Sequence, residues 1–125
     1  MPAVEFTADE LAFLREELRR QIAIGRKSDT AFDKKSRGRL LAELALSLTP
    51  DDKTRLSRSG LRELQTWTER AKDILSQSII PNYVMRAHEE SNVQEKERLS
   101  KYRAKAQKKL DTVLLPMLQR IEGAR

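Results

Sequence analysis

The residues of this chain that are best suited to chemistry are lysines and arginines, and the chemistry they offer is anion binding. Residues 98–109 carry six Lys or Arg and no acid, a net charge of +6, and residues 26–39 carry a net +4. Because the whole chain of 125 residues is also +6, everything outside these two segments sums to −4. Charge concentrated in this way predicts a surface that meets an anionic partner, and phosphate is the commonest such anion.

The first basic group follows one side of a predicted helix. From Leu99 to Ile121 apolar residues recur at steps of three or four, which is helical spacing. Beside them lies a line of cations about 16 Å long, here called the cationic ridge: Arg98, Lys101, Lys105, Lys108 and Lys109. The ridge predicts binding along a nucleic-acid backbone, RNA or DNA, with little sequence specificity. The alternative is an ordinary solvated helix side.

Two further residues near the ridge are candidates for the same surface. Arg103 lies on the other flank of the apolar residues, and Tyr102 lies where the apolar and cationic sides meet. A tyrosine there can stack on an unpaired base, or it can pack its ring on the core and leave its hydroxyl in water. Both interpretations stay open from the sequence.

The second basic group surrounds a glycine and a serine. Ser36 and Gly38 stand among four cations, and backbone N–H groups and hydroxyls of this kind often help to hold phosphates. The alternative is a solvated loop or the frayed start of a helix. The cations are Lys34, Lys35, Arg37 and Arg39.

Residues for catalysis, metals or cofactors are scarce. The chain has one histidine, His88, and no cysteine, so histidine-based metal sites, disulfides and thiolate chemistry are excluded. Its glycines stand alone, without a phosphate-binding loop. No stretch approaches the ~20 apolar residues that span a bilayer, and the first residues do not resemble a secretory signal. We expect a non-enzymatic, cytoplasmic protein without a cofactor, a metal site or a membrane partner.

The elements that position these groups are helices. Few Gly and Pro and no strand-like alternation predict an all-α fold, a bundle of four to five helices with a long C-terminal helix, in one domain over residues 1–125. Thr7 and Glu10 form a T-x-x-E capping box for a helix over 8–24. A second helix is expected over 30–48, with its first half least regular.

Start and stop signals divide the rest of the chain. Thr49-Pro50-Asp51-Asp52 predicts a helix start, with a restart that gives a helix over 58–80. Pro81 predicts a break, and a last helix runs over 82–121. Ser91 and Gln94 form a second capping box, so this last segment is either one helix or two. Pro116 predicts a kink near its end.

Two hypotheses for function follow, from different classes. The leading one is a non-catalytic basic subunit that binds nucleic-acid backbone within a larger nucleoprotein complex, beside other protein subunits. The second is a structural or adaptor protein of a virion or regulatory assembly, whose long C-terminal helix docks on partner proteins. A helix-turn-helix over 40–64 is disfavoured because Asp51 and Asp52 repel phosphate, unless a restart near Ser59 brings Arg58 and Arg62 forward.

Overall fold

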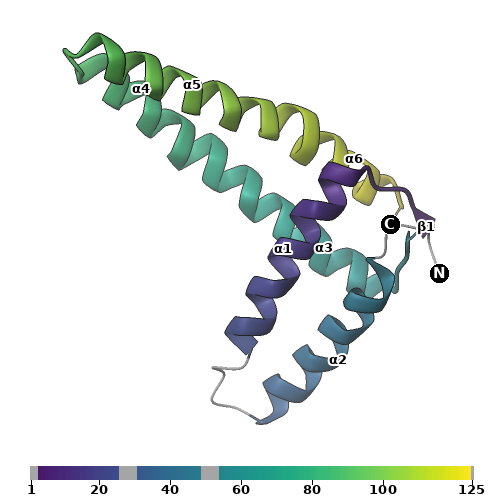
Figure 1. Cartoon of the computed structure of the whole chain (residues 1–125). Helices are drawn as coiled ribbons and strands as arrows, with labels where there is room; N and C mark the ends of the chain where they lie inside the picture. The colour runs from purple at the N-terminus through teal and green to yellow at the C-terminus, as the bar shows by residue number, and fades with distance from the viewer. Residues whose placement is uncertain (1–2, 26–30, 49–53, 125) are drawn as a thin grey trace. The chain divides into compact units, whose positions relative to one another are not determined.

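The computed structural model describes residues 3–25, 31–48 and 54–124, without the side chains of residues 3, 25, 31–37, 54 and 55. The described residues form four continuous helical runs (Figure 1), which confirms the all-α helical bundle. The runs are α1 (Ala8–Gly25), α2 (Ala31–Ser47), α3 (Arg58–Ile74) with η1 (Leu75–Ile79) and α4 (Ile80–Glu89), and α5 (Val93–Lys109) with η2 (Leu110–Leu114) and α6 (Leu115–Ala124).

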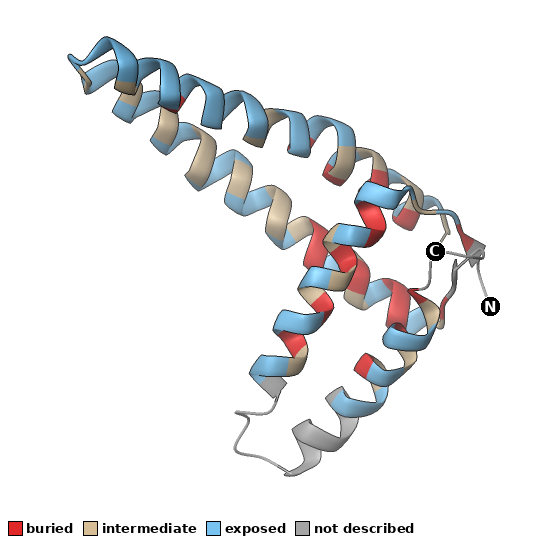
Figure 2. Cartoon of the chain, viewed as in Figure 1, coloured by how far each residue is buried: buried red, intermediate tan, exposed pale blue. Residues whose placement is uncertain are grey.

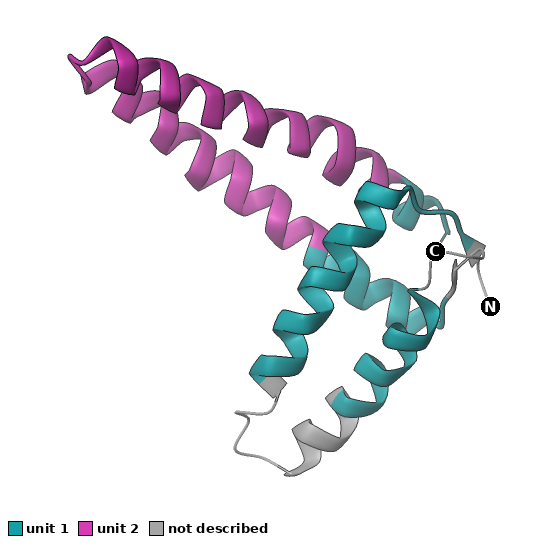
Figure 3. Cartoon of the chain, in the orientation of Figure 1, with its two compact units in different colours: residues 1–67, 120–125 teal, residues 68–119 magenta. Residues whose placement is uncertain are grey.

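The chain divides into two compact units (Figure 3). Unit 1 comprises residues 1–67 and 120–125, and unit 2 comprises residues 68–119. The boundaries fall within α3, after Trp67, and within α6, before Arg120. The single domain expected over 1–125 stays a prediction, and each unit is described by itself.

Unit 1 has a leucine core. Because leucines recur every three or four residues along α1, α2 and α3, each helix presents one apolar side, and these sides are buried (Figure 2). Trp67 is 1% exposed and satisfies its indole N–H on Glu63 Oε1 at 2.8 Å. The buried leucines of these helices are Leu11, Leu14, Leu18, Leu41, Leu44, Leu61 and Leu64.

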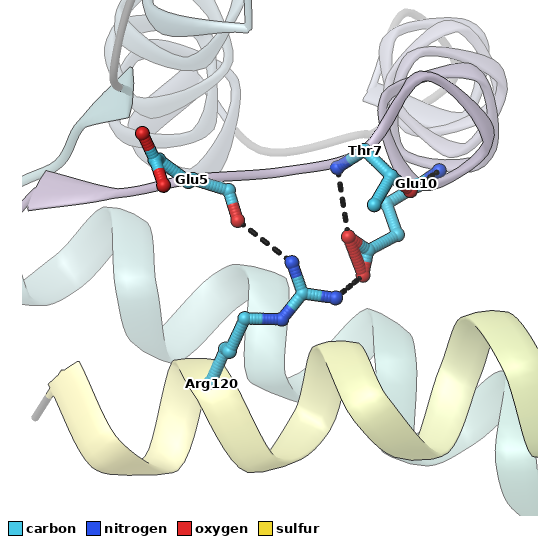
Figure 4. Close-up of polar contacts among 4 residues, drawn as sticks. All are labelled: Glu5, Thr7, Glu10 and Arg120. Carbon is cyan, nitrogen blue, oxygen red and sulfur yellow. Dashed lines mark hydrogen bonds and ion pairs between the residues drawn. The ribbon is translucent and has the colours of Figure 1, made fainter.

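The start of α1 carries the predicted capping box and an ion pair. The Thr7 N–H donates to Glu10 Oε1 at 2.8 Å, and the Glu10 N–H donates to Thr7 Oγ1 at 3.2 Å. Glu10 is 1% exposed, and its other carboxylate oxygen pairs with Arg120 (Figure 4). Arg120 also donates to the Glu5 carbonyl at 2.8 Å. One carboxylate therefore caps the first helix and holds the last turns of α6 against it.

The helix start predicted at Thr49 to Asp52 lies outside the described residues. After them comes the short strand β2 (Thr54–Arg55). β2 pairs antiparallel with β1 (Ala3–Val4), a backbone pairing that helical periodicity could not show. α3 then begins at Arg58, as the restart predicted, because the Ser57 hydroxyl accepts the Gly60 N–H at 3.0 Å.

Pro81 does not break the helix, and that prediction was wrong. The five residues of η1 precede it as a π-helix, in which the Ile80 N–H donates to the Leu75 carbonyl, five residues back. This wider turn accommodates the proline ring, which in a regular helix would clash with the carbonyl four residues before it. Pro116 follows η2 in the same way, with the Leu115 N–H on the Leu110 carbonyl.

The Glu10–Arg120 pair should be needed for stability. Arg120→Leu leaves the Glu10 carboxylate buried without its cation, so the free energy of unfolding should fall by about 3 kcal/mol, measured by urea denaturation. Arg19→Leu, at an exposed position of α1, should change it by less than about 0.5 kcal/mol. Equal losses in the two variants would show that the pair contributes nothing.

Gly38 lies inside α2, where a Cβ atom would meet no atom within 4 Å. Gly38→Ala should therefore stabilise the protein by about 0.5–1 kcal/mol, because alanine loses less backbone entropy in a helix. The midpoint of thermal unfolding should rise. Gly60→Ala is the comparison, since its Cβ would contact Ser57, Glu43 and Leu44 at 3.4–3.5 Å and should give a smaller gain. An unchanged midpoint for Gly38→Ala would contradict a helical Gly38.

Candidate nucleic-acid interface

The cationic ridge lies on α5, and Asn92 fixes where α5 begins. Glu90 is extended, so α4 and α5 are separate helices. The Asn92 side chain accepts the N–H groups of Gln94 at 2.9 Å and Glu95 at 3.2 Å. Of the two alternatives left open for this segment, the structure has two helices, and the cap is Asn92 rather than Ser91. Asparagine ranks at least as high as serine at this position.

The side chains of α5 divide as the helical wheel predicted. Leu99 is 2% exposed and Leu110 is 7% exposed, so the apolar side of the run packs inward. All five residues of the ridge are exposed, as is Arg103 (Figure 2). Because the apolar side of α5 is buried, the side that carries the cationic ridge faces solvent.

Most of the ridge is not neutralised within the protein. Among the described residues, Lys101, Lys105 and Lys108 form no ion pair. The first acid after the ridge, Asp111, accepts instead from the Gln107 amide at 3.0 and 3.1 Å. Like charges at i, i+4 cost a few tenths of a kcal/mol per pair, so three unpaired lysines in a row are an arrangement that an external anion would stabilise.

Arg98 is the exception, because neighbouring side chains hold it. Its Nε–H donates to the Tyr102 hydroxyl at 3.0 Å, its guanidinium lies 5.7 Å from the Tyr102 ring centroid, and Glu95 lies 3.7 Å away. The hydrogen bond to Tyr102 and the electrostatic interaction with it, followed by the charge of Glu95, raise the pKa of Arg98. Arg98 therefore stays charged but is less free than the lysines to reach a phosphate.

Tyr102 fits neither sequence interpretation fully. It is 42% exposed, so it is not a core residue, yet its ring lies 5.9 Å from the ring of Tyr83 in α4 at an interplanar angle of 37°. Tyr83 was not predicted from the sequence, although Ile80, Tyr83 and Ala87 follow helical spacing and are all half-buried. The tyrosine pair connects α4 with α5. The Tyr102 ring contacts both Tyr83 and Arg98, so it is not fully available to stack on a base.

The second basic group is helical rather than a loop. Lys34, Lys35 and Arg37 belong to α2, and their side chains lie outside the described part; Arg39 is exposed. Because residues 36–38 are helical, their N–H groups serve the helix, and the expected phosphate cradle around Gly38 is wrong. This group belongs to unit 1 and the cationic ridge to unit 2, so each is described by itself.

The described residues show no metal site, no membrane-spanning helix and no helix-turn-helix. No group of three His, Cys, Asp or Glu side chains is arranged to hold a metal ion within 3–25, 31–48 and 54–124, and His88 is exposed. No helix in that part of the chain is both long and apolar enough to cross a membrane. Arg58 and Arg62 are exposed at the start of α3. The described residues between α2 and α3 include the strand β2, which a helix-turn-helix does not have in its turn.

Comparisons with protein families, with curated proteins and with solved structures found no match for this chain. The cationic ridge is the surface with the clearest chemical character. Its charge and exposure favour an anionic ligand, as does the absence of ion pairs at Lys101, Lys105 and Lys108 among the described residues.

The Asn92 cap can be tested because it sets the start of the helix that carries the ridge. Asn92→Ala should lower the free energy of unfolding by about 1 kcal/mol, since two N–H groups lose their acceptor. Ser91→Ala, one residue earlier, should have little effect. Hydrogen exchange at Gln94 and Glu95 should accelerate only in the first variant. Faster exchange in Ser91→Ala instead would show that serine caps the helix.

Proposed function

We propose that this protein is a non-catalytic basic subunit that binds nucleic-acid backbone through the cationic ridge of α5. The observation that carries the proposal is the line of exposed cations, with no acid among residues 98–109. Lys101, Lys105 and Lys108 form its centre, because they make no ion pair among the described residues.

The proposed recognition is of the backbone rather than of the bases. Lysine is a point charge that suits phosphate oxygens. Recognition of bases instead requires side chains that form bidentate hydrogen bonds in a groove, or aromatic rings on which unpaired bases stack. The only aromatic residue on α5 is Tyr102, and Tyr83 and Arg98 already contact it. Binding should therefore be dominated by the release of counterions and vary little with sequence, in RNA or DNA.

The remaining parts of the proposal concern context. A ridge about 16 Å long covers only a few phosphates, so useful affinity requires further contacts from other subunits of a nucleoprotein complex, which we expect in the cytoplasm. Arg39, with Lys34, Lys35 and Arg37, is proposed to assist as a second, separate contact.

The adaptor hypothesis keeps one observation in its favour. No residue of η1 or α4 is buried, and Val84 and Met85 are 42% and 55% exposed. Exposed apolar side chains on one helix suit a protein surface rather than a phosphate. This feature lies on α4, whereas the ridge lies on α5, so the two functions do not compete for the same residues.

The salt dependence of nucleic-acid binding tests the proposal. Affinity for a fluorescent single-stranded RNA and for a DNA duplex should fall linearly with salt on logarithmic axes. Lys101→Gln/Lys105→Gln should weaken binding to every sequence alike and reduce the slope by about 1.4–1.8, which corresponds to two lost phosphate contacts. Circular dichroism should show an unchanged helix content.

Arg19→Gln/Arg20→Gln is the matched control, because it removes the same charge from exposed positions of α1. It should leave the slope within the error of the unaltered protein. Equal effects of both double variants would indicate a response to net charge alone. No binding at low salt, or binding that the lysine variant leaves unchanged, would contradict the proposal.

A further inference from the structure

Unit 2 has a second exposed surface, on a stretch of helix without charged residues. From Ile74 to Met85 no residue is charged, although 35% of the whole chain is. This stretch covers the end of α3, all of η1 and the first part of α4, and no residue of η1 or α4 is buried. Ile74 is 47% exposed, and Met85 is 55% exposed. An exposed, uncharged helix side offers nothing to phosphate and is typical of a protein contact.

Helical spacing places eight exposed residues on one side of this run. Within each half the residues are spaced 3, 1 and 3 apart, so they lie on adjacent turns of one side. The step from Gln77 to Asn82 is five, which matches the i→i+5 turn of η1. The opposite side carries half-buried Ile80, Tyr83 and Ala87, and Tyr83 contacts α5. The 70–89 face thus points away from α5; it consists of Arg70, Asp73, Ile74, Gln77, Asn82, Met85, Arg86 and Glu89.

The order of side chains along this face is self-complementary. Consider a second copy packed antiparallel on it, with a two-fold axis between Ile79 and Ile80. Ile74 then lies opposite Met85 of the second copy, and Gln77 lies opposite Asn82. Farther out, Asp73 meets Arg86 of the second copy. Arg70 meets Glu89. This single register pairs apolar with apolar, amide with amide, and opposite charges at both ends.

We infer that the protein forms a homodimer through the 70–89 face. A two-fold interface uses the same patch on both subunits, so the patch must complement its own inverted copy. A different protein partner would not require this match within one sequence. The two charged pairs also fix the register, since a shift along the helices would bring like charges together.

The geometry allows the outer pairs to meet. Helices that cross at about 20° stay close over several turns, and arginine and glutamate side chains are long enough to cover the remaining separation. Asp73 also lies 3.7 Å from Lys72, with side-chain exposures of 53% and 34%, and so exposed a carboxylate retains room for a second partner. One helix pair buries less than a standard interface, so the dimer should dissociate in the micromolar range.

The inference does not rest on the proposed nucleic-acid function. Because the 70–89 face points away from α5, dimerisation leaves the cationic ridge uncovered and gives each dimer two ridges. Loss of nucleic-acid binding would leave the dimer in place, and loss of the dimer would leave each ridge intact.

Charge reversal tests both the dimer and its register. Sedimentation equilibrium of the full chain in the micromolar range should show reversible dimers. Asp73→Arg brings arginine opposite Arg86 of the second copy, and Arg86→Asp brings aspartate opposite Asp73. Each variant alone should dissociate at least about tenfold more readily. An equimolar mixture of the two restores opposite charges and should recover the dimer.

Glu16→Arg and Arg19→Asp are the matched controls, since they make the same charge changes at exposed positions of α1 and should dimerise as the unaltered chain does. Circular dichroism should show that all four variants are equally helical. A chain that stays monomeric throughout the range would overturn the inference. So would a mixture that associates no better than its separate components, because the proposed register would then be wrong.

Discussion

The surfaces of unit 2 depend on one constraint: two helices that pack as a hairpin have a single seam in which to bury apolar side chains. α4 buries no residue, and along α5 only Leu99 is buried. Each helix therefore keeps a broad exposed side on which packing sets no requirement. Packing does not determine which residue types stand on such a side, so solubility or binding can determine them. The two helices differ in charge: α5 carries many cations, whereas the run leading into α4 has no charged residue from Ile74 to Met85.

This separation lets one small unit carry two different surfaces. A phosphate-binding surface needs cations without acids among them, whereas a surface that packs on its own copy must avoid uncompensated like charges. Placed on one helix, these requirements would conflict. On two helices they are kept apart, and the helices contact each other at the Tyr83–Tyr102 pair, where Arg98 lies over the Tyr102 ring. The tyrosine pair therefore lies in the contact between α4 and α5 and also borders the cationic ridge.

Local signals were readable from the sequence where neighbours within one turn decide the structure. The Thr7–Glu10 box, the limits of α1 and the outward position of Lys101, Lys105 and Lys108 follow from spacing alone. The predicted break at Pro81 failed because a helix can widen by a π turn instead of ending, and the choice depends on packing that a local pattern does not contain. The β1–β2 pairing joins residues far apart in the chain, beyond the reach of any local pattern.

The division of the chain has a consequence for the order in which the protein folds during synthesis. Unit 2 is contiguous, from Thr68 to Gln119, so its contacts are local and can form once those residues have left the ribosome. Unit 1 is not, because Glu10 receives its partner only when Arg120 has been made. Until then the first helix has its cap, but the Glu10 carboxylate has no counter-charge. The amino-terminal helices therefore gain this ion pair only after all of unit 2 has been synthesised.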